Sequence, residues 1–216
     1  MTPERFRRLR AVLERRQPDL TVLMDGVHKS HNFSAILRSC DAAGVLEAHV
    51  VPSADGLELH HGTSAGTRKW VRVRRHETVT AAALHLRGAG FRILAAHPSK
   101  GAADYREVDY TTPTALMLGA ELEGVSVAGL ALADADVRIP LEGMVHSLNV
   151  SVAAALLLFE ARRQREAAGL YGATRLPPEE FERRLFEWAY PSLAAKRRRA
   201  GRAYPVLDED GEITRR

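Results

Sequence analysis

The most apolar stretch of the chain lies at residues 150–159, where only Ser151 is polar. A helix of that composition has no face for water, so its own domain or a second subunit must enclose it. A short strand is predicted at residues 137–139, and Pro140 ends it. Ser147 is a candidate N-cap for the helix, because a serine oxygen accepts hydrogen bonds from first-turn amides. We expect this helix at a dimer interface.

Strands and helices alternate through the part of the chain that precedes this helix. Short apolar runs predict the strands, and amphipathic runs between them predict the helices. Such alternation is typical of a parallel α/β sheet. Asn32 is placed to cap the first of these helices. The predicted strands cover residues 21–24, 47–51, 70–73, 91–96 and 114–118, and the predicted helices cover residues 32–43 and 78–87.

Amphipathic helices are also predicted near the two ends of the chain, at residues 4–16 and 177–188. The first places Phe6 and Leu13 on one face and arginines on the other. From Lys196 onward the sequence turns basic and then acidic, which indicates a mobile tail. We therefore divide the chain into a basic helical extension (1–18), a core domain (19–169), a second helical extension (170–195) and a tail (196–216).

The composition is that of a globular protein with one main domain. The chain has 216 residues, of which 45% are hydrophobic and 27% charged, which excludes disordered and fibrous classes. Cys40 is the single cysteine and no cationic, apolar leader opens the sequence, so we expect a cytoplasmic protein. The longest wholly apolar run, residues 152–159, is too short to cross a bilayer, and no membrane partner is expected.

Positive charge is gathered in arginine-rich clusters, and the net charge is +4. Guanidinium groups bind phosphate bidentately, which makes a polyanion such as RNA a reasonable partner. Solvated helix faces explain any single cluster equally well, but the combined pattern favours nucleic acid. The clusters lie at residues 1–16, 68–75, 162–165 and 196–202.

Three local patterns suggest other chemistry and are rejected. His60 and His61 are adjacent, but they lack a third ligand at a useful spacing and a nearby cysteine, so no metal is expected. The loop at residues 119–124, GAELEG, lacks the third-position glycine of a dinucleotide fingerprint, and Gly26 stands alone after the first strand. No G-x-S-x-G elbow surrounds Ser147, which argues against a serine hydrolase.

Three segments resemble the motifs of one enzyme family. They are NFSAILR at the start of residues 32–44, LGAELEGVS at residues 118–126, and IPLEGMVHSLNVSVA at residues 139–153. Together and in this order they are similar to the SPOUT class of RNA methyltransferases, specifically the TrmH family of 2′-O-ribose methyltransferases. The resemblance covers about residues 21–169. It implies a parallel-sheet α/β SPOUT fold with a C-terminal deep trefoil knot, which departs from the general rule against knotted chains.

The resemblance also implies a cofactor, a partner and a substrate. Knot loops of this family bind S-adenosyl-L-methionine, and the enzymes are obligate homodimers. Other branches carry a separate RNA-binding domain before the catalytic one, whereas here the first motif begins at Asn32. This layout is similar to the branch that methylates the 2′-hydroxyl of the guanosine at position 18 in the tRNA D-loop. A ribosomal RNA 2′-O-methyltransferase and a non-catalytic RNA-binding protein of the same fold are the alternatives.

Individual residues receive roles from the same resemblance. Arg38 is expected to carry the reaction, either as a base once a substrate phosphate contacts it or by orienting and polarising the hydroxyl; a free guanidinium is ordinarily a poor base. Asn32 is expected to position Arg38, Glu121 to belong to the active site, and Ser147 and Asn149 to order the cofactor loop and the substrate. The residues placed around the cofactor are Ala96, Gly119, Ala120, Glu121, Ile139, Met144 and Leu148.

Six cationic residues are predicted RNA contacts. They lie beside the catalytic loop, on the first helix and past the end of the apolar helix. Contacts of this kind position RNA through its phosphates without specifying its sequence. The six are Lys29, His31, Arg8, Arg16, Arg163 and Arg165.

Overall fold

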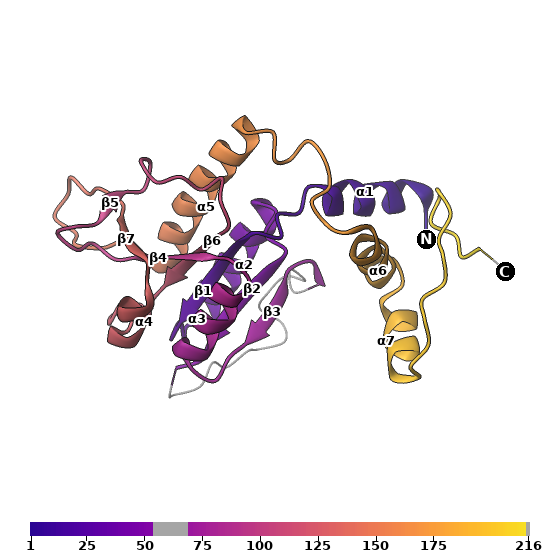
Figure 1. Cartoon of the computed structure of the whole chain (residues 1–216), viewed down its shortest axis with the longest axis horizontal. Helices are drawn as coiled ribbons and strands as arrows, with labels where there is room; N and C mark the ends of the chain where they lie inside the picture. Colours follow the sequence, from indigo (N-terminus) through magenta and orange to yellow (C-terminus); the bar gives the residue numbers. More distant parts are fainter. Residues whose placement is uncertain (54–68, 215–216) are drawn as a thin grey trace. The chain divides into compact units, whose positions relative to one another are not determined.

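The structure, a computed structural model, describes residues 1–53 and 69–214 (Figure 1). His60 and His61 lie outside the described residues. The chain divides into two compact units, one of residues Gln17–Leu170 and one that combines Met1–Arg16 with Tyr171–Arg216. The two helical extensions that the sequence predicts as separate parts therefore belong to one unit.

The larger unit is built on a parallel sheet. Its strand order is β3-β2-β1-β6-β4-β7-β5, and all the pairs are parallel. The predicted α/β class with a parallel sheet is confirmed. Every residue of the central strands β1 and β6 is buried, as expected for a sheet covered on both faces. The strands described are β1 Leu20–Asp25, β2 Glu47–Val51, β3 Arg72–Arg75, β4 Arg92–Ala96, β5 Ala103–Asp104, β6 Thr114–Leu118 and β7 Ala135–Arg138.

Helices cover the sheet on two faces and create two separate cores. Val22 and Met24 of β1 pack in the core that includes α2 (Ser30–Ala42) and α5 (Val150–Ala167). Leu23, between them, packs in the other core with side chains of α3 (Val79–Gly88). Successive side chains of a strand point to opposite faces, which explains this division. The short helix α4 (Val127–Leu132) lies against α3 and β4.

Two predicted helix caps are wrong. Helix α5 begins at Val150 and its N-cap is Asn149, whose side chain accepts a hydrogen bond from the Ser151 amide at 2.8 Å, so Ser147 lies before the cap. Helix α2 begins at Ser30, which places Asn32 within its first turn. Asparagine and serine are equally good caps, so local sequence could not choose between Ser147 and Asn149. Helix α2 instead has Lys29 at its N-cap, which makes no side-chain cap hydrogen bond.

The smaller unit is helical. It contains α1 (Pro3–Glu14), α6 (Pro178–Ala189) and α7 (Pro191–Arg199), and α1 packs against α6. The sequence predicts the first two of these helices and misses the third. None of the helices in the described part of the chain is long and apolar enough to span a membrane.

The predicted mobile tail is instead packed within this unit. Its first residues complete α7, and Tyr204 then stacks on Phe186 of α6 with ring centroids 4.8 Å apart. The Tyr190 hydroxyl donates to the Gly211 carbonyl at 2.7 Å. A side chain at Gly211 would lie 2.4 Å from the Phe6 ring, so this backbone passes directly over α1. A few contacts made by Tyr204 and Gly211 hold a segment whose overall polarity had indicated disorder.

Candidate active site

Three of the predicted catalytic side chains form one chain of hydrogen bonds. Asn149 Nδ2 donates to Asn32 Oδ1 at 3.1 Å, and Asn32 Nδ2 donates to Glu121 Oε1 at 2.8 Å. Asn149 begins α5, Asn32 lies in the first turn of α2, and Glu121 lies in the loop after β6. The fold therefore brings the three sequence motifs together at the carboxyl ends of the central strands, where open α/β sheets bind their ligands.

Glu121 contacts two residues besides Asn32. Its Oε1 also accepts from the Lys29 amide at 3.3 Å, and its Oε2 lies 3.0 Å from His28 Nδ1. Burial acts to raise the pKa of Glu121, but the hydrogen bond from Asn32 and the other favourable contacts outweigh it and lower the pKa below its ordinary value of 4.5. The side chain is therefore an ionised acceptor at neutral pH.

Asn149 joins the network to the start of α5. Its Oδ1 accepts from the Ser151 amide at 2.8 Å and from the Ser151 hydroxyl at 2.6 Å, while its Nδ2 is engaged by Asn32. A rotation of this amide would break the helix cap and the link to Asn32 together. Asn32 itself is buried, with 1% of its surface exposed. These hydrogen bonds fix the start of α2, the loop after β6 and the start of α5 relative to one another.

The loop that carries Glu121 depends on Gly119. Ala120 and Gly124 exchange two backbone hydrogen bonds of 2.9 Å, which folds the chain back on itself. A side chain at Gly119 would lie 1.9 Å from the Gly124 carbonyl carbon, so no other residue fits there without moving the loop. The fold of the loop itself therefore requires glycine at position 119. The predicted close approach of Gly119 to a cofactor stays a prediction.

Asp25 is a functional candidate that the sequence analysis missed. It ends β1, is 7% exposed, and its Oδ2 accepts from the Ser126 amide at 2.9 Å. Ser126 caps α4 by accepting from the Gly129 amide at 3.0 Å. This contact ties the second motif to the first strand. A carboxylate at the end of an otherwise uncharged, buried strand was the signal available in the sequence.

A pocket of about 110 Å³ opens at the carboxyl ends of β4 and β7. Ala96, Ile139 and Leu148, all predicted cofactor contacts, line it together with Ser147. Pockets that enclose a drug-sized ligand have volumes of about 300–1,000 Å³, so this one matches part of such a ligand. Its lining is largely apolar, which favours an uncharged part of a ligand.

The other predicted cofactor residues do not line this pocket. Gly119, Ala120 and Glu121 belong to the neighbouring loop after β6, and Met144 is 94% exposed on the loop before α5. The predicted cofactor contacts therefore fall into two groups, one in the pocket and one outside it.

Arg38 is exposed on α2. Within one chain it does not contact Asn32, so the predicted positioning of Arg38 by Asn32, within the chain or across a dimer, stays a prediction. In the part of the chain that the structure describes, the guanidinium makes no hydrogen bond and no ion pair. Both ends of the Asn32 amide are occupied by Glu121 and Asn149. Asn32 therefore orders the loops, and the Arg38 donors are available to a substrate.

Two predicted RNA contacts are wrong because their side chains are buried. Arg165 is 0% exposed and pairs with Asp19 at 2.7 Å, and Arg16 is 1% exposed and lies over the Trp188 ring at 5.3 Å. Arg163 is exposed and bound to Glu160 at 2.7 Å. For the exposed side chains of Arg8, Lys29 and His31 the RNA contact stays a prediction.

Comparisons with known proteins agree with the three motifs. The sequence model of the SpoU rRNA Methylase family matches residues 19–159, and that of the SpoU, rRNA methylase, C-terminal family matches residues 163–216. A similar relative is the tRNA (guanosine(18)-2′-O)-methyltransferase of Escherichia coli strain K12. It is 49% identical over 215 residues, which cover 99% of this chain and 94% of the relative.

Solved structures that resemble this chain are also SpoU-type methyltransferases. The A. aeolicus TrmH/SpoU tRNA modifying enzyme aligns with a TM-score of 0.81 and 43% identity, over 88% of this chain and 97% of that chain. The SpoU methyltransferase AviRb from Streptomyces viridochromogenes, in complex with the cofactor AdoMet, aligns with a TM-score of 0.60 and 30% identity, over 71% of this chain and 62% of that chain.

Proposed function

Because the chain belongs to the SpoU rRNA methylase family, we propose that it transfers a methyl group from S-adenosylmethionine to the 2′-hydroxyl of guanosine 18 in tRNA. The observation that carries the proposal is the hydrogen-bond chain from Asn149 through Asn32 to Glu121, because it unites the three motifs in one site. The name of the Escherichia coli relative, which spans nearly the whole chain, supports the tRNA substrate.

The cofactor would be held at the carboxyl ends of β4 and β7. Ala96, Ile139 and Leu148 offer an apolar surface there, and the loop of Gly119 and Glu121 lies after the neighbouring strand β6. S-adenosylmethionine supplies an electrophilic methyl group when it is bound. Most of the acceleration comes from holding the two reactants in line, which converts an encounter in solution into a reaction within one complex.

Arg38 acts on the hydroxyl that accepts the methyl group. Its fork of N–H donors can bind the 2′-oxygen and an adjacent phosphate at once, which orients and polarises the hydroxyl, whose proton passes to solvent water as the methyl group is transferred. Asn32, Glu121 and Asn149 are positioning residues, since they bond to one another and fix the loops around that point. Lys29 and His31 are exposed and precede Arg38 on the chain. They would contact RNA phosphates.

The proposal includes a homodimer formed through α5. Val152, Leu156 and Phe159 are 47%, 38% and 45% exposed, and their spacing places them on one side of the helix. Burying this stripe in a second copy removes apolar surface from water. Leu156→Asp should convert a dimer to monomers in sedimentation experiments. The trefoil knot and a cytoplasmic location belong to the same proposal.

Transfer of labelled methyl groups to unmodified tRNA, followed by nuclease mapping, tests the function. We expect label in 2′-O-methylguanosine at position 18 and none in a matched tRNA with 2′-deoxyguanosine there, because that nucleotide lacks the acceptor oxygen. Arg38→Ala should abolish turnover and retain cofactor affinity. Label only in ribosomal RNA would contradict the tRNA substrate, and cofactor binding without transfer to either RNA would contradict the enzyme assignment.

A further inference from the structure

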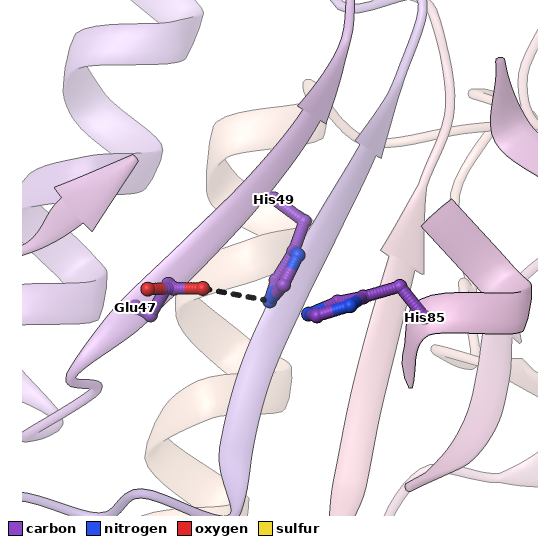
Figure 2. A group of neighbouring side chains, drawn as sticks. All are labelled: Glu47, His49 and His85. Carbon is purple, nitrogen blue, oxygen red and sulfur yellow. Dashed lines mark ion pairs between the residues drawn. The ribbon is translucent and has the colours of Figure 1, made fainter. Parts of the chain in front are cut away.

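One carboxylate and three imidazoles converge at the β2 side of the sheet, and none of them belongs to the candidate active site. Glu47 and His49 are two residues apart on β2, so both point to the same face of the strand. Helix α3 packs against β2 and contributes His85, and His76 follows β3. Figure 2 shows the side chains of Glu47, His49 and His85 directed toward one another.

The spacing of these groups is close to that of metal ligands. One ligand atom from each of Glu47, His49 and His85 lies within 4.8 Å of the others, and His49 Nε2 is 3.8 Å from Glu47 Oε1. Zinc bonds of about 2.0–2.2 Å in tetrahedral geometry separate ligand atoms by roughly 3.4 Å. Small side-chain rotations therefore suffice to bring the three atoms onto one ion.

His76 is placed to orient His49. His49 Nδ1 and His76 Nε2 are 2.9 Å apart, which is a hydrogen bond between the two rings. When His49 donates this bond, its Nε2 carries the free lone pair and faces Glu47 and His85. Metal-binding histidines commonly use their second nitrogen in this way, which fixes both the tautomer and the ring orientation.

His49 is buried, whereas His76 is partly exposed and His85 is exposed. His49 is 4% exposed, and burial, assisted by the neighbouring imidazoles and opposed by Glu47, lowers its pKa to about 4.

Two arginines moderate the charge of Glu47. Arg74 Nε lies 2.6 Å from its Oε1 and Arg72 Nε lies 3.2 Å from its Oε2. A carboxylate has about four lone-pair positions, so room for one further ligand bond remains. The two guanidinium charges repel a cation, and we therefore expect a weaker and more exchangeable site than one built from cysteines.

We propose that Glu47, His49 and His85 bind a divalent transition-metal ion of the Zn²⁺ type, with His76 orienting His49. Imidazole ligands suit this class of ion, whereas Mg²⁺ and Ca²⁺ prefer oxygen ligands alone. A bound ion links α3 to β2 and so stabilises this edge of the sheet. Only the adjacent His60 and His61 suggested a metal site in the sequence. The residues of this cluster are separated along the chain, and the sheet and α3 bring them together.

Calorimetric titration of the full-length, chelator-treated protein with Zn²⁺ tests the proposal. We expect one bound ion per chain in the wild type and an affinity loss of more than about tenfold in His85→Ala. His76→Ala, which removes the ring that orients His49, should also lose about 10- to 100-fold in affinity. His85 is exposed on a helix, and alanine is the best helix former, so the first variant retains the fold. His31→Ala, which removes an exposed histidine elsewhere, is the matched control and should bind like the wild type.

A second readout separates a specific site from weak surface binding. Zn²⁺ should raise the thermal unfolding midpoint of the wild type and of His31→Ala, and leave that of His85→Ala unchanged, because only a native-state ligand stabilises. Co²⁺ bound in the same place should show visible absorption that His85→Ala lacks. If the wild type binds no Zn²⁺, or if His85→Ala binds it as tightly, the proposal fails and the cluster is a packing arrangement of imidazoles.

Discussion

The two ends of helix α5 use polar side chains in opposite ways. Near its carboxyl end, the guanidinium of Arg165 is fully buried and donates to Asp19, Gln17 and the carbonyls of Tyr110 and Thr112. At the amino end, Asn149 is exposed and links loops that border a pocket. One end holds the domain together, and the other presents hydrogen-bonding groups where a ligand can reach them.

This contrast teaches how to separate structural from functional polar residues. Arginine is a common RNA ligand, and on its sequence pattern Arg165 was a predicted RNA contact. Its five N–H donors are all satisfied inside the protein, which leaves none for a phosphate. Arg38, with the same side chain, is exposed on α2 and has its donors available. Burial and completed hydrogen bonds decide the role, and residue type does not.

Among the variants that test this comparison, Arg165→Met should show the largest loss of stability. Removing one partner of a buried ion pair costs about 3–5 kcal/mol, because Asp19 and several carbonyls lose their donors. Urea unfolding should show this loss, while the kcat of the remaining folded protein stays near the wild-type value.

Arg163→Met is the matched control for Arg165. Its side chain is 66% exposed and its pair with Glu160 is at the surface, so the loss should be about 0–1 kcal/mol. Equal losses in the two variants would contradict the structural role of Arg165.

Asn149→Asp should have a smaller effect on stability and a clear effect on activity. Aspartate caps a helix as well as asparagine does, so the unfolding free energy should change by less than about 1 kcal/mol. It cannot donate to Asn32, and its charge faces an amide oxygen and nearby Glu121. We expect kcat to fall by about tenfold or more, which equals about 1.4 kcal/mol in the transition state.

The outcome for Asn149 is informative in either direction. If Asn149→Asp lost stability in proportion to activity, the side-chain amide would serve only the fold. Asn149→Ala, which removes the cap and the donor at once, should lose about 0.5–2 kcal/mol of stability as well as activity. Unchanged kcat in Asn149→Asp would separate the hydrogen-bond network from catalysis.

The smallest expected effect concerns the charge of Glu121 at acid pH. Its pKa is lower in the folded state than its ordinary value of 4.5, so the unfolded chain binds more protons in this range. The stabilisation is complete above pH 4.5 and is lost as the pH falls through the lowered value. Glu121→Gln, which cannot titrate, should therefore show a shallower loss of stability below pH 4.5 in urea unfolding.

His49 also contributes to the pH dependence of the unfolding free energy. Its pKa is lowered from 6.5 to about 4, so stability also falls as the pH drops between these values. This contribution is the same in the wild type and in Glu121→Gln, and it cancels in the difference. An unchanged slope below pH 4.5 in the variant would show that the Glu121 carboxylate does not stabilise the folded state.

Local patterns predicted much of the fold. Strand β6 (Thr114–Leu118) has the predicted bounds, and α3 begins after Thr78, whose side chain caps it. These features depend on neighbours along the chain, such as an apolar run or a cap followed by a helical period. The same reasoning failed for α7, because this basic segment has too few apolar residues to show a helical period.

The sequence by itself determined the parallel α/β class and the three motifs, together with the residues that we expect to bear on the reaction. Only the tertiary structure decided what each polar group does. Asn32 meets partners 89 and 117 positions away, and Arg165 meets Asp19 at a separation of 146. Hydrogen bonds of that range have no periodicity along the chain, since their partners are chosen by strand order and by which helix covers which face of the sheet.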